Sequence, residues 1–403
     1  MPGIYAGLRI LELGAGAAGP AATRYFAEQG ADVVRLESSK RPDFLRTLRM
    51  APSDPRGLEG SSMFALLNPG KRSVALNLQE PEGVELALGL VRWADVVLEN
   101  FSPGVMERFG LGAERLLAEK PELILVSSSL FGQTGPQRSY PGFGGQGSAI
   151  AGFNALTGWP DREAIGPYAT ITDSLSPRYV AVLIAAALLE RRRSGRGQRI
   201  DLSQIEAGVY SLSEAIVRYS ANGEVVRRAG NRDERAAPHG IYPCLGDDAW
   251  IAISVWDDAQ WEALGAAMGD PAWASDARFA MLQGRRAHQD EIDRQLASWT
   301  REFGAWYLMA GLQGVGVPAG VVQSVHDVLR DPQLAHRRHF VTIEHPVLGP
   351  LVHERSGFRL ASHPGGFERP APRLGEHTED VLGEILGLAP ERIRELGARG
   401  VAV

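Results

Sequence analysis

The sequence predicts an α/β protein with a mostly parallel, doubly wound sheet and a second, smaller domain. Three observations support this fold class. Short apolar runs alternate with helical segments along the first half of the chain, as in repeated units of strand, helix and parallel strand. The 403 residues are far more than the ~150 of an average domain. A composition with 44% hydrophobic and 22% charged residues is that of an ordinary globular protein.

The first predicted unit opens the chain. A buried strand at 8–13 leads through a glycine-rich loop at 14–20 to a helix at 21–29 and a second strand at 31–36. Parallel strands need such a crossover connection, and the same alternation continues along the chain. Further strands are predicted at 72–78, 94–98, 123–128 and 198–202. One further helix is predicted to begin at Pro81, and two more are predicted at 178–193 and 203–222.

Beyond this part, the charged segment 230–235 is predicted to be a linker. Residues 240–330 show the pattern of a smaller α/β domain. They hold most of the eight tryptophans, which we interpret as core or interface residues. The predicted elements are a strand at 250–255, helices near 257–268 and 288–312, and a last helix near 376–386 in the tail.

Charge, cysteine content and hydropathy argue against several classes of protein. A net charge of −6 disfavours a dedicated nucleic-acid or anionic-membrane surface. The only cysteine, Cys244, excludes an internal disulfide and a cysteine-cluster metal site, as expected in the cytoplasm. The longest wholly apolar run, 180–189, is far shorter than the ~18 residues of a membrane span. We therefore expect a cytoplasmic protein that binds neither nucleic acid nor membrane.

The loop after the first strand is the first candidate site. Gly14, Gly16 and Gly19 match the GxGxxG pattern, in which backbone N–H groups and a helix N-terminus bind a pyrophosphate. Pro20 removes one of these donors, and no cluster of dehydrogenase residues follows. Two interpretations stay open here: dinucleotide binding, and glycines that merely let the strand and the helix pack closely.

Two further candidates follow predicted elements. The segment ENFSPG at 99–104 comes directly after a strand, where doubly wound folds bind ligands. Asn100 could donate to an anion, Phe101 could stack on a base and Arg108 could pair with a phosphate, unless the segment is only a solvated turn. Asp173 precedes the most apolar helix, where its position fits a helix N-cap best and also suits a nucleophile. The sequence holds no HExxH, GxSxG or P-loop motif.

Six motifs carry a resemblance that spans nearly the whole chain. They are GLRILEL at 7–13 with AGP at 18–20, GADVVRLE at 30–37, NPGKRSVALNL at 68–78, ENFSPG at 99–104, GRGQRIDLS at 195–203 and PRLGEHT at 372–378. In sequence and order these motifs resemble the class III CoA-transferases. This family contains formyl-CoA transferase and carnitine CoA-transferase, and it also includes alpha-methylacyl-CoA racemase.

The resemblance implies an architecture. A Rossmann-like large domain would be formed by residues 1–225 and completed by 326–403, with a smaller α/β domain at 230–325. Because members of the family form interlocked dimers, we expect a homodimer. A heteromer that includes a paralogous subunit is the alternative.

The resemblance also implies the reaction, in which CoA moves from an acyl-CoA donor, with succinyl-CoA preferred, to a small carboxylic acid. Asp173 matches the family's catalytic aspartate, which forms an acyl anhydride and then an aspartyl-CoA thioester. Coenzyme A would enter as part of a substrate, and no metal or permanently bound cofactor is expected. The expected CoA contacts are Gly16, Ala17, Lys40, Leu76, Asn100, Phe101, Val105, Arg108 and Phe109.

The chain departs from the family pattern at three places. Ser38 stands where a basic residue often follows the second strand, so Lys40 or Arg41 would contact a phosphate instead. Residues 240–265 lack the glycine-rich lid of formyl-CoA transferase, so a preference for oxalate is not implied. Racemases place a histidine after a glycine, where this chain has Gly142-Phe143, and an acyl-CoA racemase is therefore the less favoured alternative. A non-catalytic subunit is a second alternative, against which the retained aspartate argues.

Overall fold

The chain forms two compact units in a computed structural model that describes residues 3–48, 51 and 53–402. Residues 154–165, expected in the large domain, group with the second unit, because Trp159 packs on Gly230 and the Gly158 carbonyl accepts the Gly230 N–H at 2.9 Å. The predicted bounds of the large domain, 1–225 with 326–403, and of the small domain, 230–325, stay predictions. Unit 1 comprises Met1–Phe153, Gly166–Glu224 and Arg338–Val403, and unit 2 comprises Asn154–Ile165 and Val225–Arg337.

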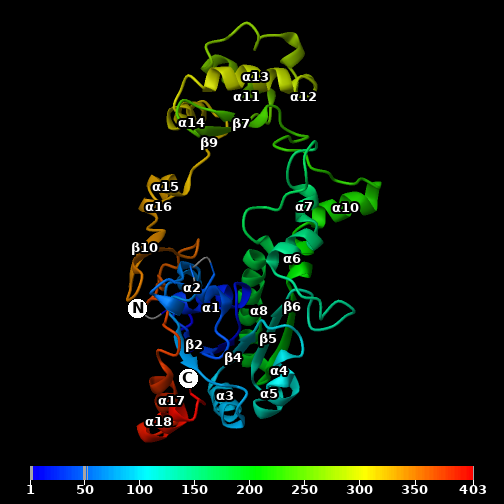
Figure 1. The fold of residues 1–403 in the computed structure, drawn as a ribbon. Coiled ribbons are helices and arrows are strands. Elements are labelled where there is room, and N and C mark those ends of the chain that lie inside the picture. The colour runs from blue at the N-terminus through cyan, green and yellow to red at the C-terminus, as the bar shows by residue number, and fades with distance from the viewer. Residues whose placement is uncertain (1–2, 49–50, 52, 403) are drawn as a thin grey trace. The chain divides into compact units, whose positions relative to one another are not determined.

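Unit 1 is built around a parallel sheet of six strands. The strands are β1 (Arg9–Leu13), β2 (Asp32–Glu37), β3 (Arg72–Ala75), β4 (Val96–Glu99), β5 (Ile124–Ser129) and β6 (Gln198–Ser203). Their order across the sheet is β3-β2-β1-β4-β5-β6, and every neighbouring pair is parallel, which confirms the predicted sheet. Figure 1 labels β2, β4, β5 and β6 of this sheet. The order reverses between β1 and β4. Doubly wound sheets bind ligands beyond the carboxyl ends of their strands at such a reversal.

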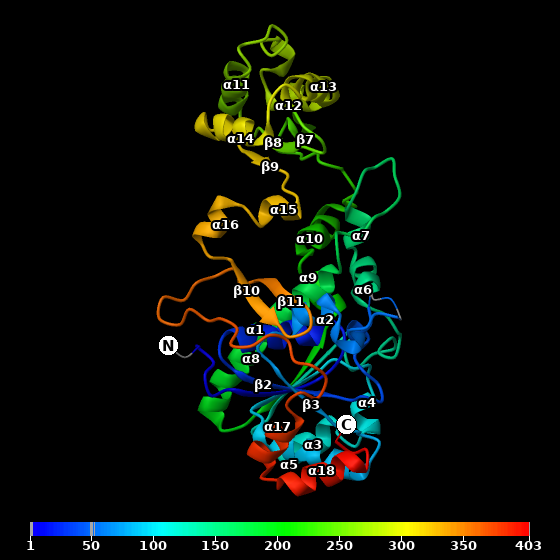
Figure 2. The same cartoon turned by 60° about the vertical axis from the view of Figure 1, so that its left-hand side comes forward.

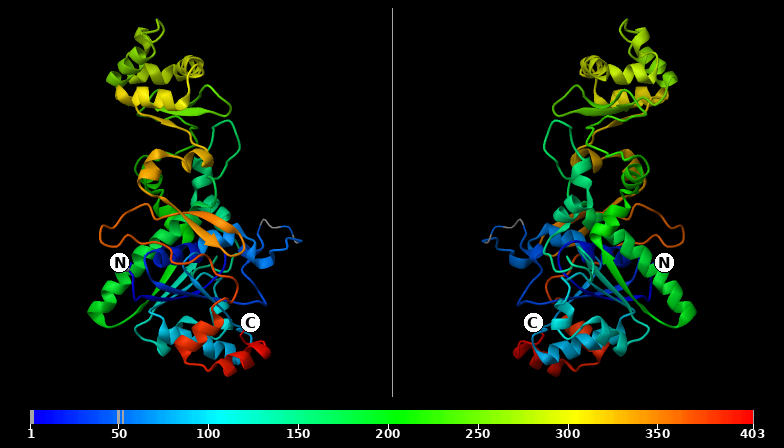
Figure 3. Two further views of the ribbon diagram at one scale, coloured as in Figure 1. Left: turned by 90° about the vertical axis from the view of Figure 1, so that its left-hand side faces the viewer. Right: turned by 90° about the vertical axis from the view of Figure 1, so that its right-hand side faces the viewer.

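Helices cover both faces of this sheet (Figure 2). One face carries α1 (Ala18–Glu28) and α8 (Ile171–Ser194), and the other carries α3 (Pro81–Trp93), α5 (Ala113–Glu119), α17 (Thr378–Leu386) and α18 (Pro390–Ala398). Neighbouring strand residues point to opposite faces, so Ile10 and Val33 pack under α1 while Leu11 and Val34 pack in the other core. Figure 3 shows the last two helices, in red, beside the cyan helices from the first half of the chain.

The long apolar helix differs from its predicted bounds. It begins at Ile171 instead of at 178, and the prediction was wrong because Pro177 has the signature of a helix boundary. The helix continues through this proline, which has no N–H to donate to the carbonyl one turn earlier. By length and composition α8 could cross a membrane, but it packs on α1 and β5. The helix predicted at 203–222 is in fact two helices, α9 (Gln204–Tyr210) and α10 (Ser213–Asn222).

Several other elements of unit 1, and a short helix at its boundary with unit 2, were not predicted. The glycine-rich stretch that begins at 132 contains two helices, and the tail contains an antiparallel hairpin and a final helix after α17. Glycine-rich composition hid the helices, since glycine is a poor helix former. These elements and the remaining short helices are α2 (Ser62–Leu67), α4 (Val105–Arg108), α6 (Gly144–Ala151), α7 (Phe153–Leu156), β10 (Phe340–His345) and β11 (Gly349–Glu354).

Unit 2 is a three-stranded antiparallel sheet packed against helices. Trp261 and Phe279 lie in its core, as expected for a tryptophan-rich domain, whereas Trp256 is 42% exposed. The helix predicted at 288–312 is interrupted before Gly304 and forms two helices. The elements are β7 (His239–Pro243), β8 (Trp250–Ser254), β9 (Ala319–Val321), α11 (Asp258–Ala267), α12 (Leu282–Ala287), α13 (Gln289–Thr300), α14 (Ala305–Gly314), α15 (Val325–Val328) and α16 (Pro332–His336).

Candidate functional site

Asn100 joins the two loops at the reversal point of the sheet. Its Oδ1 accepts the Ala15 N–H at 3.1 Å, and its Nδ2 donates to the Ala15 carbonyl at 2.8 Å. A Cβ at Gly14 would lie 1.9 Å from this Oδ1, and one at Gly19 would lie 2.8 Å from it. These two glycines therefore make room for Asn100. This packing favours the close-packing interpretation of the glycine motif over dinucleotide binding.

A second contact occupies the loop from the other side. The Gly16 N–H donates to both carboxylate oxygens of Asp43, at 3.1 and 3.2 Å, and Asp43 is paired with Arg35. With the Ala15 N–H bonded to Asn100, two donors of the loop are already satisfied within the protein. These two N–H groups are therefore not available to a pyrophosphate, which weakens the dinucleotide interpretation of the loop.

A buried ionic cluster lies under this loop. Glu12 at the end of β1 pairs with Arg35 of β2 and with Lys71, and all three side chains are fully buried. Burial alone would raise the pKa of Glu12, but the charges of Lys71 and Arg35 outweigh it and hold that pKa below its usual value. Burial lowers the pKa of Lys71 to about 8, with the charge of Glu12 opposing the shift. Arg35 also donates to the Gly14 carbonyl at 3.1 Å, so the cluster fixes the loop.

Asp173 lies where two other helices begin. The N-cap of α8 is Thr170, which places Asp173 in the first turn, so its expected role as N-cap was wrong. Gln204, the first residue of α9, donates from Nε2 to Asp173 Oδ1 at 3.1 Å. On the other side, a Cβ at Gly144, the first residue of α6, would lie 2.3 Å from Asp173 Oδ2. The half-buried carboxylate is therefore confined between α6 and α9.

Two aromatic rings connect Asp173 to the glycine loop. Phe143, next to Gly144, has its ring centroid 5.6 Å from that of Phe44. The Phe44 ring in turn packs on Gly16, since a Cβ there would be 3.1 Å from it. Phe143 is 67% exposed and Phe44 is 43% exposed, so both rings present apolar surface between the glycine loop and the start of α6. Sequence reasoning missed Phe44 as a site residue, because no motif surrounds it.

The other expected CoA contacts lie in the segments that follow β1, β2, β3 and β4. The rings of Phe101 and Phe109 meet edge to face at 6.3 Å, and both pack against the core that fully buries Leu76. Lys40 and Arg108 are exposed cations. Ala17 is the N-cap of α1 and Val105 is the first residue of α4.

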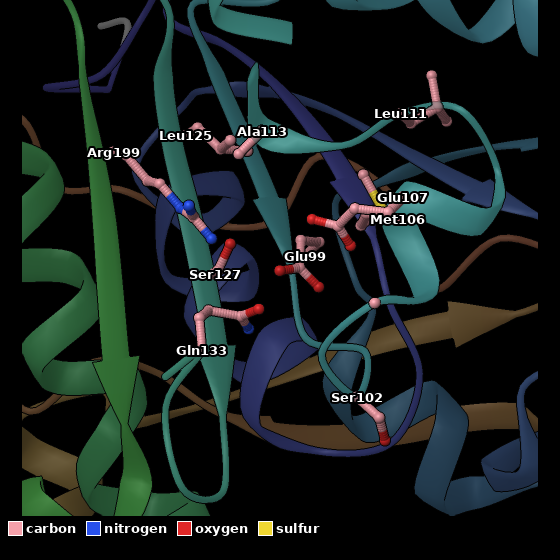
Figure 4. A pocket seen from close by; sticks show the side chains of 11 residues that line it. Glu99, Ser102, Met106, Glu107, Leu111, Ala113, Leu125, Ser127, Gln133 and Arg199 are labelled. Atoms are coloured by element: carbon pink, nitrogen blue, oxygen red, sulfur yellow. The ribbon is translucent and has the colours of Figure 1, made fainter. Parts of the chain in front are cut away.

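Glu99 is a buried carboxyl under the Asn100–Phe101 loop, which the sequence did not single out as titratable. Figure 4 shows it in a pocket toward which the side chains of Ser127 and Arg199 also point. Its Oε2 accepts the Phe101 N–H at 2.9 Å. Burial raises the pKa of Glu99 to about 7, against the hydrogen bonds from Ser127 and Phe101.

Known proteins resemble this chain over its whole length. The model of a family described as CoA-transferase family III matches residues 5–378. Succinyl-CoA–D-citramalate CoA-transferase of Chloroflexus aurantiacus is 37% identical over 98% of this chain and 97% of that protein. The beta subunit of succinyl-CoA–L-malate CoA-transferase from the same organism is 33% identical over 98% and 97%. The crystal structure of a CAIB/BAIF family protein from Brucella suis matches with a TM-score of 0.88 and 31% identity, covering 96% of this chain and all of that one.

Proposed function

Because the chain belongs to CoA-transferase family III, we propose that it transfers CoA from succinyl-CoA to a second carboxylic acid through Asp173. Membership of the family makes CoA thioesters its substrates. Two relatives with succinyl-CoA in their names support this donor. The observation that carries the proposal is the chain of contacts from Asp173 through Gly144, Phe143 and Phe44 to Gly16.

The reaction follows from carboxylate chemistry. An oxygen of Asp173 attacks the thioester carbon, the bond to sulfur breaks, and an acyl anhydride and CoA thiolate form. The thiolate then attacks Cγ of Asp173 and expels the donor acid as its carboxylate, which leaves an aspartyl-CoA thioester. The carboxylate of the acceptor acid attacks this thioester to give a new anhydride and free thiolate. Attack of the thiolate on the acceptor's acyl carbon yields the new acyl-CoA and restores Asp173.

In this proposal the expected CoA contacts divide into residues that touch CoA and residues that support the loops beneath it. Lys40 and Arg108 are exposed cations that suit phosphates, and Phe101 offers an aromatic surface for the base. The Asn100 side chain is paired with Ala15, so we assign it the role of holding the loop, in place of direct contact with CoA. We keep Gly16, Ala17, Val105 and Phe109 as backbone or apolar contacts, and the buried Leu76 as support beneath them.

We also propose that the protein forms a homodimer in the cytoplasm. Helices α8 to α10 leave large apolar side chains exposed, and the beta subunit among the relatives supports assembly from more than one chain. The exposed residues include Val182, Leu189, Tyr210, Ile216, Val217 and Tyr219.

Asp173→Asn tests the proposed nucleophile. An amide cannot form the anhydride or the thioester, so transfer from succinyl-CoA to a panel of acids should fall by roughly 10³-fold or more, while binding of the CoA ester persists. The control is Asp270→Asn, at an exposed position whose φ of 52° asparagine tolerates.

Mass detection of new thioesters measures the transfer. Near-normal activity of Asp173→Asn, after deamidation has been excluded by mass, would overturn the proposal. Deuterium uptake at the alpha carbon without CoA exchange would support the racemase instead.

A further inference from the structure

We infer that Gln204 fixes Oδ1 of Asp173 and stabilises negative charge on it, so that only Oδ2 exchanges with substrates. This inference rests on the proposed function of Asp173. It adds which carboxylate oxygen of Asp173 reacts with substrates and which side chain donates a hydrogen bond to the other oxygen.

The Gln204 amide is held firmly. Its side chain is buried, with 6% exposed, and Nε2 lies 3.1 Å from Asp173 Oδ1. The preceding residue, Ser203, caps α9 by accepting the Glu206 N–H at 3.2 Å and donates to the Leu130 carbonyl at 3.2 Å. The start of α9 is therefore tied to the end of β5, which fixes the backbone from which the buried amide reaches Asp173.

The other oxygen is confined by a glycine. A Cβ at Gly144 would overlap Oδ2 at 2.3 Å and Cγ of Asp173 at 2.5 Å. The Gly144 carbonyl accepts the Thr172 hydroxyl at 3.0 Å and the Ser148 hydroxyl at 2.8 Å, so α6 and α8 are fastened together at this point. Oδ2 thus lies against the backbone of Gly144, the residue that follows Phe143, while Oδ1 faces the Gln204 amide.

The chemistry gives the two carboxylate oxygens of Asp173 different roles. When Oδ2 carries the acyl group, Oδ1 is the carbonyl oxygen of the aspartyl anhydride. Attack of CoA thiolate on Cγ moves an electron pair onto Oδ1, and the N–H of Gln204 can stabilise this oxyanion. Its collapse expels the donor acid together with Oδ2. The acceptor carboxylate then supplies the replacement oxygen, and its attack on the thioester again places the charge on Oδ1.

This sequence of steps predicts an isotope pattern. After many turnovers with an acceptor acid labelled with oxygen-18 in its carboxylate, Asp173 of the wild type should carry one heavy oxygen, because Oδ1 never leaves. A carboxylate that turned freely between turnovers would accumulate two. Mass spectrometry of the peptide that contains Asp173 distinguishes the two results.

Gln204→Met tests the donor, because methionine has a similar volume but no N–H. We expect kcat to fall roughly 10²–10³-fold, with little change in the KM for succinyl-CoA. The labelled peptide should now carry two heavy oxygens. The control is Glu206→Gln, an exposed substitution in the same first turn of α9, which should keep the wild-type kcat and a single heavy oxygen.

Two results would overturn the inference: a wild type that accumulates two heavy oxygens, or a Gln204→Met variant with unchanged kcat. Neither would affect the proposed function if Asp173→Asn remains inactive. Should the methionine variant fail to fold, Gln204→Glu keeps the shape and places a second carboxylate beside Asp173. The acid limb of its kcat/KM profile should move to higher pH, and an unmoved limb would also overturn the inference.

Discussion

Among single residues, Gly144 lies directly against the Asp173 carboxylate, so a substitution there tests how tightly that carboxylate is held. A methyl group there would overlap the Asp173 carboxylate at 2.3 Å, so Gly144→Ala should displace it. A misplacement of the nucleophile by about 1 Å lowers kcat on the order of 10²-fold. Steady-state assays with succinyl-CoA check this expectation.

Its neighbour provides the matched control. In the described part of the chain, the ideal Cβ of Gly145 meets no atom within 4 Å beyond its own surroundings in the helix. Gly145→Ala should therefore keep its activity, and the better helix propensity of alanine should stabilise the fold by up to about 0.5–1 kcal/mol. Equal losses of activity in the two variants would mean that helix distortion, not the overlap with Asp173, is responsible.

Glu99 makes the stability of the fold depend on pH. The pKa of Glu99 is about 7 when folded and near 4.5 in an unfolded chain, so the folded state binds the extra proton between these values. Stability from this group is therefore complete below pH 4.5, is lost as pH rises to 7, and stays lost above it. Glu99→Gln should match the wild type at pH 4 and be more stable at pH 8, by up to about 3 kcal/mol.

Urea unfolding of both proteins at several pH values measures this difference. Glutamine can still accept the Phe101 N–H, so the loop should be retained. Glu107 and Arg199 also face Glu99, and the charge of Glu107 raises its pKa while that of Arg199 lowers it. A stability gain that is equal at pH 4 and pH 8 would rule out ionisation of Glu99 as its cause.

At the scale of the element, sequence patterns predicted what apolar periodicity controls. All six strands of the parallel sheet were predicted within a few residues. Most of them contain the short apolar run that is typical of a buried parallel strand, whereas β6, with the sequence QRIDLS, is mostly polar and partly exposed. The start of α8 was missed because Pro177 mimics a boundary, and α6 was missed because its first turn is glycine. The glycine at 144 makes room for the Asp173 carboxylate and for the Thr170 side chain, two contacts between residues far apart in the sequence.

In the candidate site, too, some residues were predicted from the sequence and others were missed. The loops at Gly16 and Asn100 were identified through motifs, and Asp173 through its place before the most apolar helix and the family resemblance. Gln204, Phe44 and the buried partners of Glu12 were not identified as site residues. Charged residues such as Arg35 look like solvent-facing positions in a sequence, and only the three-dimensional structure reveals that they are paired under the glycine loop. Their burial is costly unless every partner is present, which ties the shape of the loop to the integrity of β1 and β2.

At the scale of the whole molecule, the exposed apolar side chains of unit 1 argue for a second chain. Val182 on α8 is 68% exposed and Tyr210 on α9 is 71% exposed, and only a third of the most apolar window of α8 is buried within one chain. Contiguous apolar surface of this kind marks an interface more often than free surface.

Light scattering at micromolar concentration should therefore give the mass of two chains. Val182→Glu should shift this mass to that of one chain, because an unpaired carboxylate is costly to bury in an interface. Arg193→Gln, at an 82% exposed position on the last turn of the same helix, should remain dimeric. A stable wild-type monomer, or an unchanged mass in Val182→Glu, would exclude this face as the dimer contact.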